Sequence, residues 1–167
     1  MLGHVLVPLD GSELAQSALD HALDVISAGS TITLLTVLEP QEVALYDFYP
    51  STIIPKSNED EKSTYAAIAR AQSYLKRLAL DISEIHDYQV TTQVEVGDAA
   101  TKIADIADDL KVDAIVMSTH GRSGISRWLF GSVTQKVLSA APCPVFVIPA
   151  KTHAEIKSRE LAQSQSS

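Results

Sequence analysis

The stretch from Met117 to Lys136, MSTHGRSGISRWLFGSVTQK, has the residue types of a loop that holds an anion. Its glycines, which let a backbone approach a ligand closely, are Gly121, Gly124 and Gly131. The helix predicted after the loop begins at Gly131 and Ser132, and unpaired N–H groups and the helix dipole favour negative charge at such a start. Arg122 and Arg127 could add positive charge. The pattern predicts a phosphate site, and an ordinary helix-capping loop is the alternative.

Three other side chains could take part in binding or chemistry. Thr134, like Ser132, could donate a hydroxyl hydrogen bond. Asp10 ends a predicted strand and could contact a ligand there, or it could cap the turn at Gly11 and Ser12. His120 could donate to a phosphate or transfer a proton, but a structural role is commoner for a single histidine before a turn glycine.

Two widespread phosphate motifs are missing from the chain. No GxxxxGK[ST] sequence occurs, which excludes a P-loop nucleoside triphosphatase. No GxGxxG follows the first predicted strand, which excludes a standard dinucleotide-binding site. No convincing set of metal ligands is found either, so no metal-binding residues are predicted.

The 167 residues fit one domain with a formal net charge of -8. That charge argues against nucleic acid or anionic lipid as a partner, because such partners need a basic surface. No apolar run reaches the roughly 18 residues of a membrane span, and the first residues lack the basic segment of a signal peptide. The single cysteine, Cys143, suits a reducing compartment, so we expect the cytoplasm.

The acidic residues are unevenly distributed. Residues 1–113 hold 19 acids and 7 bases, whereas residues 114–153 hold four bases and no acid. This asymmetry can mark an anion site, and the alternative is that residues 114–153 are mostly buried strand and loop.

Short apolar runs alternate with helical patterns along the chain. Strands are predicted at residues 4–9, 31–38, 90–96, 114–118 and 144–148. Helices are predicted at residues 14–26, 58–84, 98–110 and 131–140, with Ser12 and Asp98 capping the first and the third. The second helix shows an apolar stripe that includes Tyr65 and Ile85, and the third is expected to bury Leu110.

This alternation predicts an α/β fold, a parallel sheet with helices on both faces. Ligands of such sheets bind beyond the carboxyl ends of the strands, where the strand order reverses. Residues 39–57 form a long loop that could be a lid or a mobile excursion, and residues 151–167 form a polar tail.

Four blocks of the sequence resemble the universal stress protein family, nucleotide-binding branch. They are VPLDGS at residues 7–12, LLTVLEP at 34–40, MSTHGRSG at 117–124 and GSVTQKV at 131–137. The family pattern of Gly, two residues, Gly, nine residues, then Gly-Ser/Thr is matched from Gly121 onward, and Ser118 takes the place of the first glycine. The resemblance covers about residues 3–149. It implies a single doubly wound, Rossmann-like domain over residues 1–150, with five parallel strands in the order 3-2-1-4-5 and four helices.

The resemblance further implies an adenine nucleotide, ATP or else ADP or AMP, with Mg²⁺ as a possible companion. Asp10 would hold the ribose or shape the pocket, Val37 would meet the adenine edge through its backbone, and the glycine loop would surround ribose and phosphates. The candidate binding residues are Pro8, Leu9, Asp10, Val37, Met117, Ser118, His120, Gly121, Arg122, Gly124, Gly131, Ser132, Val133 and Thr134.

Three functions remain open at this point. The first is a nucleotide-binding stress-response or signalling protein, the second a slow ATPase or phosphotransferase, and the third a dimeric adaptor that has lost nucleotide binding. A homodimer is expected through the last strand, residues 144–148, because an uncovered apolar sheet edge tends to associate. Cover of that edge by residues 151–167 is the alternative.

Overall fold

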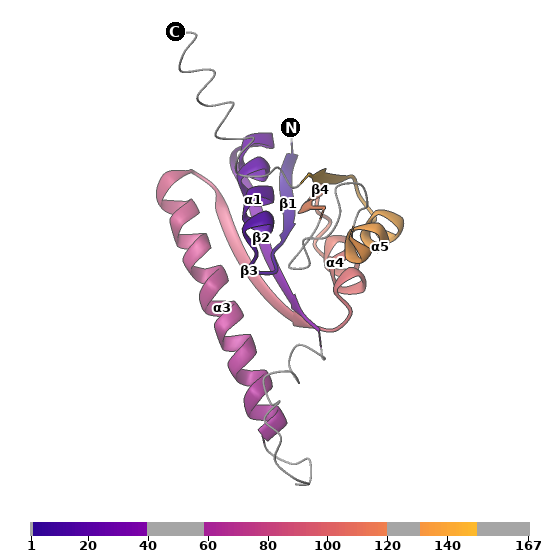
Figure 1. The fold of residues 1–167 in the computed structure, drawn as a ribbon. Helices are drawn as coiled ribbons and strands as arrows, with labels where there is room; N and C mark the ends of the chain where they lie inside the picture. The colour runs from indigo at the N-terminus through magenta and orange to yellow at the C-terminus, as the bar shows by residue number, and fades with distance from the viewer. Residues whose placement is uncertain (1, 40–58, 120–130, 150–167) are drawn as a thin grey trace, which may run out of the picture.

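The computed structural model describes residues 2–39, 59–119 and 131–149, and strands alternate with helices through these residues (Figure 1). The strands in these ranges are β1 (Leu2–Pro8), β2 (Ile26–Leu38), β3 (Gln89–Val96), β4 (Ala114–Ser118) and β5 (Val145–Ile148). The helices are α1 (Glu13–Val25), α3 (Glu59–Ile85), α4 (Ala99–Asp109) and α5 (Ser132–Ala140).

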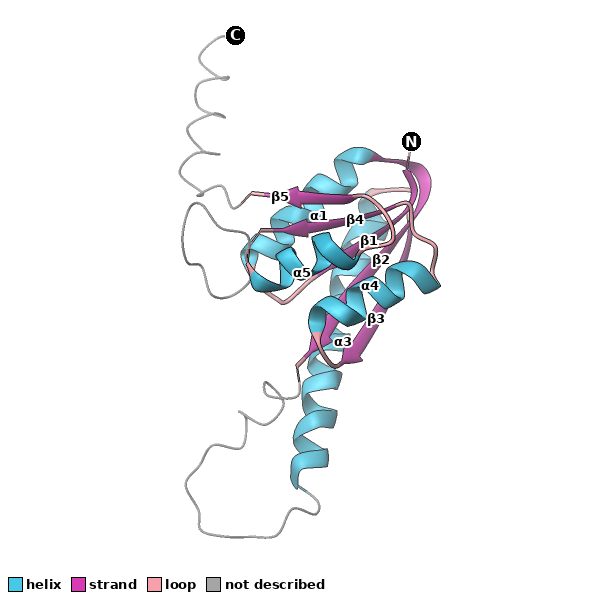
Figure 2. Cartoon of the chain, turned by 90° about the vertical axis from the view of Figure 1, so that its right-hand side faces the viewer, coloured by secondary structure: helices cyan, strands magenta, loops and turns pink. Residues whose placement is uncertain are grey.

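The five strands form one parallel sheet in the order β3-β2-β1-β4-β5, which confirms the predicted α/β fold. Helices α1 and α3 cover one face of the sheet, and α4 and α5 cover the other (Figures 1 and 2). The order of strands reverses at β1, so the carboxyl ends of β1 and β4 flank the position where such folds bind ligands.

Alternate residues of the central strands supply two separate cores. Val5 and Val7 of β1 pack toward α1 and α3, whereas Leu6 packs toward α4 and α5. On β2, Leu34 packs toward α1 and α3, and Leu35 packs toward α4 and α5. All five side chains are fully buried. Burial on both faces explains why these strands are continuous apolar runs in the sequence.

Local capping residues set the starts of two helices, as predicted. The side chain of Ser12 accepts a hydrogen bond from the amide of Ala15 at the start of α1, and Asp98 accepts one from the amide of Thr101 at the start of α4. Each bond satisfies an N–H group that the helix itself leaves unpaired.

Strand β2 starts five residues earlier than expected, directly after α1. It begins at Ile26, and its pairing with β1 shifts register before His4 meets Thr31. Gly29 lies in this irregular part with φ of +80°, a conformation that glycine adopts without strain. α1 is therefore followed directly by a strand that begins irregularly, and sequence periodicity does not reveal this junction.

Part of the predicted apolar pattern does not match the buried faces. Tyr65 and Ile85 on α3 are 68% and 74% exposed, and the prediction that Leu110 is buried is wrong because it is 40% exposed. The start of α3 extends past the strands (Figure 1), and Ile85 and Leu110 stand where α3 and α4 end, so the sheet does not cover them.

Candidate functional site

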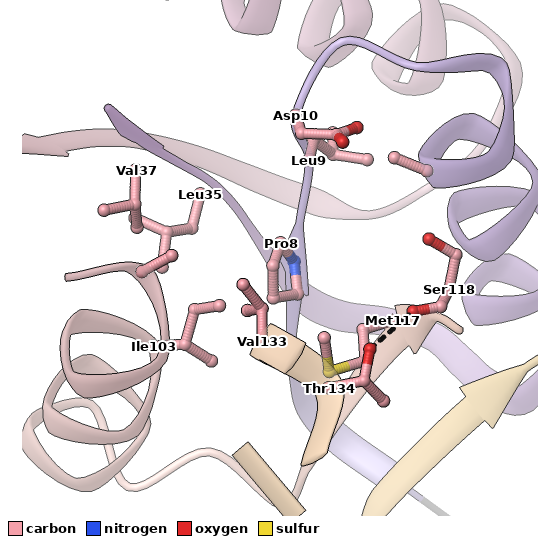
Figure 3. Close-up of a pocket in the computed structure, with 12 residues that line it drawn as sticks. Pro8, Leu9, Asp10, Leu35, Val37, Ile103, Met117, Ser118, Val133 and Thr134 are labelled. Carbon is pink, nitrogen blue, oxygen red and sulfur yellow. Dashed lines mark hydrogen bonds between the residues drawn. The ribbon is translucent and has the colours of Figure 1, made fainter. Parts of the chain in front are cut away.

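A pocket of about 140 Å³ opens at the carboxyl ends of β1, β2 and β4, where the first turns of α4 and α5 meet the sheet (Figure 3). It is lined by Pro8, Leu9, Asp10, Ala15, Leu35, Val37, Ala99, Ile103, Met117, Ser118, Val133 and Thr134. The pocket therefore lies at the reversal of strand order that the fold rule selects.

Eight of the fourteen candidate binding residues line this pocket. They are Pro8, Leu9, Asp10, Val37, Met117, Ser118, Val133 and Thr134. Gly131 and Ser132 stand directly before Val133, at the start of α5. The other four candidates, His120, Gly121, Arg122 and Gly124, lie outside the described residues, as do the 39–57 loop beyond Glu39 and the predicted tail.

The sequence analysis missed four lining residues, all apolar. Leu35 lies two residues before Val37 on the same face of β2, a signal that strand alternation offers. Ala15 belongs to the first turn of α1, and Ala99 and Ile103 belong to the first two turns of α4. Only the packing of those helices on the sheet brings these residues to the pocket.

Asp10 performs the capping role that the sequence left as an alternative. Its Oδ1 accepts hydrogen bonds from the amide of Ser12, at 3.0 Å, and from the hydroxyl of Ser12, at 2.6 Å. The Ser12 hydroxyl in turn accepts from the amide of Ala15 at 3.2 Å, so Asp10 is linked to the first turn of α1. Asp10 also lines the pocket, and the capping bonds hold its carboxylate at the rim.

Hydrogen bonds join the end of β4 to the start of α5. The hydroxyl of Thr134, a residue 3% exposed, lies 3.2 Å from the carbonyl oxygens of both Ser118 and Thr119 and shares its single proton between them. Figure 3 shows the bond to Ser118. The amide of Gly131 donates to the carbonyl of Thr119 at 2.8 Å. These bonds hold the start of α5 against the end of β4, next to the pocket residues Ser118 and Val133.

Helices α4 and α5 differ in how their first turns are capped. Asp98 accepts from the amide and the hydroxyl of Thr101 at 3.0 and 2.8 Å and pairs with the ammonium of Lys136 at 3.3 Å. These interactions lower the pKa of the Asp98 carboxyl to about 2, with the bond from the Thr101 amide as the largest cause. The N-cap of α5 is Gly131, which has no side chain to accept from the first turn.

Within the part of the chain that the structure describes, no three His, Cys, Asp or Glu side chains gather as metal ligands would. Over the same residues, no helix combines the length and the apolar character needed to cross a bilayer.

Comparison with known proteins identifies the class to which this sheet and pocket belong. The model of the universal stress protein family matches residues 1–149, and the chain belongs to that family, as the sequence blocks implied. Universal stress protein MJ0531 of Methanocaldococcus jannaschii is 28% identical over 144 residues, which cover 86% of this chain and 80% of the relative. Universal stress protein MJ0577 of the same organism is 28% identical over 159 residues, covering 90% and 97%.

Solved structures agree with the fold. The structure of MJ0577 superposes with a TM-score of 0.75 at 25% identity, covering 90% of this chain and 97% of that one. UspA from Lactobacillus plantarum gives a TM-score of 0.70 at 25% identity, with 87% and 96% covered.

Two more distant structures contain a nucleotide. A universal stress protein in complex with cAMP has a TM-score of 0.54 at 21% identity, covering 89% of this chain and 97% of that one. A family protein from Arabidopsis thaliana with AMP bound has a TM-score of 0.60 at 18% identity, covering 89% and 92%. At these identities the likeness concerns the fold alone.

Proposed function

We propose that this chain binds an adenine nucleotide, ATP or else ADP or AMP, at the carboxyl ends of its strands and acts as a stress-response or signalling protein. The observation that carries the proposal is the pocket itself, with apolar walls and a rim at the start of α5. Pockets that enclose a whole drug-sized ligand measure roughly 300–1,000 Å³. At about 140 Å³, this pocket suits one flat ring system and leaves sugar and phosphates outside.

The walls suit a base. Leu35, Val37, Ile103, Met117 and Val133 provide apolar contacts on several sides of the pocket. A flat heterocycle buries two apolar faces and directs its polar edge at backbone groups, which matches a pocket with few polar side chains. In this proposal the backbone of Val37 meets the adenine edge and Asp10 contacts the ribose.

The rim suits phosphates. The first turn of α5 begins at Gly131 without a capping side chain, so its N–H groups and the helix dipole can favour an anion. The hydroxyl of Ser132 adds a donor there. We include Gly121, Gly124, Arg122 and His120 in the proposed site because the resemblance of MSTHGRSG to the family's glycine loop implies a role for them.

The relatives support the class of ligand. The cAMP and AMP complexes show that this fold holds adenine nucleotides in other members of the family. For this chain the proposal rests on its own pocket, with Mg²⁺ as a possible companion of the phosphates.

The proposal is tested by calorimetric titration with ATP, ADP, AMP and adenosine, with and without Mg²⁺. We expect saturable binding that Ala99→Phe abolishes, because the larger ring fills the pocket that Ala99 lines. Ala140→Phe is the matched control, since Ala140 is exposed at the far end of α5 and should not affect binding. If the unaltered chain binds no nucleotide, the proposal is wrong and the alternative of a dimeric adaptor without nucleotide binding remains. Phosphate release from bound ATP would instead identify a slow ATPase.

We further propose a homodimer through β5 and a cytoplasmic location. β5 is an edge strand of the sheet, and its Phe146 is 42% exposed, which leaves apolar surface for a second copy. Val147→Lys should remove the self-association that β5 provides, which sedimentation experiments would detect as a smaller assembly than that of the unaltered chain. The single cysteine supports a reducing compartment.

A further inference from the structure

The sheet has a second edge, formed by β3, whose backbone is paired on one side. All eight residues of β3 pair with β2 in an uninterrupted parallel register from Gln89 to Val96. Within the described residues β3 is the outermost strand, on the side of the sheet opposite β5 (Figure 2). An edge of this length presents a row of peptide groups that can pair with another strand.

β3 has few of the features that normally prevent strands from associating. Proteins protect an edge with proline, with bulges or with charged side chains. The sequence of β3, QVTTQVEV, has no proline and a single charged residue, Glu95, and its pairing with β2 has no bulge. The Glu95 carboxylate pairs with Lys102 at 3.2 Å and accepts from Gln93 at 3.0 Å, so its charge is balanced within the molecule.

A groove runs beside this edge, between β3 and α3. It has a volume of about 460 Å³ and is lined by Gln72, Lys76, Ala79, Leu80, Ser83, Val90, Thr92 and Val94. Leu80 is 56% exposed although it stands next to the apolar side chains of Val90 and Val94. A partner strand laid against β3 would cover this apolar surface.

The order of residues in β3 points to the partner. We propose that β3 pairs antiparallel with β3 of a second copy of this chain, about a two-fold axis at Thr92. In that register Val90 faces Val94 of the other copy on the α3 side, Thr91 faces Gln93 on the opposite side, and Thr92 faces itself. A two-fold interface requires such self-complementarity, and the stretch VTTQV is close to a palindrome.

The one charged residue of β3 allows this pairing. Glu95 faces Gln89 of the other copy, so that a carboxylate meets an amide and no like charges are opposed. The two α3 helices come to the same face of the joined sheet, with their grooves facing each other, and the Leu80 side chains gather between them. The contact is separate from the β5 dimer and from nucleotide binding, so a chain that uses both edges assembles beyond a dimer.

Cysteine cross-linking tests the register. In a Cys143→Ser background, Thr92→Cys places two thiols directly opposite each other, within disulfide reach. We expect a covalent dimer under mild oxidation, with at least a tenfold higher yield than for Thr91→Cys. That matched control lies diagonally across the axis, at a separation of about 7–8 Å. Equal yields for the two variants, or no covalent dimer from either, would overturn the proposal.

Sedimentation provides the second measurement and separates the two edges. In chains carrying Val147→Lys, β3 pairing should leave a reversible dimer, and adding Val94→Lys should raise its dissociation constant at least tenfold. A Val147→Lys chain that is monomeric at all accessible concentrations contradicts the proposal. A dimer that Val94→Lys leaves unchanged also contradicts it, because its contact must lie elsewhere, at β5 or in another segment. Circular dichroism verifies that each variant is folded.

Discussion

Helices α4 and α5 lie on the same face of the sheet and both begin beside the pocket, yet their starts are chemically opposite. α4 starts with a carboxylate, Asp98, that satisfies its first turn, and α5 starts with Gly131, which supplies no side chain. A carboxylate cap repels a phosphate, whereas an uncapped turn can accept one. Because the two helices share one face of the sheet, the capping residue, more than the fold, decides which helix start is open to an anionic ligand.

The two starts are also held in place differently. Asp98 fixes α4 through bonds to its own first turn, whereas α5 is fixed through Thr134, whose hydroxyl bonds to the end of β4. A buried tertiary contact therefore holds the start of α5, where α4 has a capping side chain. Gly131 has no side chain that could extend into the mouth of the pocket.

The largest expected effect comes from making α5 resemble α4. Gly131→Asp places a carboxylate cap at the start of α5, and a charge a few ångströms from a phosphate should lower ATP affinity about a hundredfold or more. Gly131→Asn is the matched control, because asparagine caps as well as aspartate but carries no charge. Titration calorimetry of both variants with ATP and adenosine checks this.

Adenosine should not distinguish these two variants, since it carries no phosphate. Equal ATP affinities for the Asp and Asn variants would show that the phosphates do not lie at α5. The φ of Gly131 is −59°, which any residue can adopt, so neither substitution strains the backbone.

The second prediction concerns the contact that holds α5. Thr134→Val keeps the shape of the side chain and removes the hydroxyl that donates to the Ser118 and Thr119 carbonyls. Loss of a buried donor of this kind should lower the free energy of unfolding by about 1–3 kcal/mol, measured by denaturant titration. Thr134→Ser, which retains the hydroxyl, should lose less; a larger loss for serine than for valine would mean that methyl packing matters more than the bonds.

The starts of α4 and α5 also illustrate which features of the structure the sequence can predict. Ser12 and Asp98 were predicted as caps because a cap depends on residues three positions apart, and the place of the pocket followed from strand order. The pairing of Asp98 with Lys136 joins residues 38 positions apart, and the wall at Ile103 depends on how α4 packs on the sheet. Tertiary contacts of this kind leave no local pattern.

The exposed residues of α3 and the early start of β2 differ from the sequence predictions for other reasons. An apolar stripe is a property of the helix, but burial also needs a surface opposite to it, and in the part of the chain that the structure describes the sheet does not cover Tyr65 or Ile85. β2 starts at Ile26, which the predicted helix also included, and Gly29 takes a positive φ within the irregular first part of the strand.

The third prediction is a pH dependence that distinguishes α4 from α5. The pKa of Asp98 is lowered to about 2 from 3.8, so its ionised form stabilises the folded state. That contribution is fully present above pH 4 and is lost as pH falls through the folded value near 2. Asp98→Asn, which still caps, should therefore differ most from the unaltered chain above pH 4 and converge with it toward pH 2. Urea titrations across this range measure the difference, and a constant gap would contradict the assignment.

The smallest expected effect links the two helix starts through Lys136. Lys136 lies one turn beyond Ser132 on α5, but its ammonium pairs with Asp98 at the start of α4. Asp98→Asn should weaken that pairing and allow Lys136 to turn toward a phosphate at α5, raising ATP affinity about twofold, since exposed ion pairs contribute little. Lys136→Met should lower affinity slightly and cancel the gain when the two substitutions are combined. Calorimetry on the four chains of this cycle measures the coupling between the two sites. Additive effects would mean that Lys136 does not contact the phosphates. The difference between the capped start of α4 and the uncapped start of α5 would then depend on Gly131 alone.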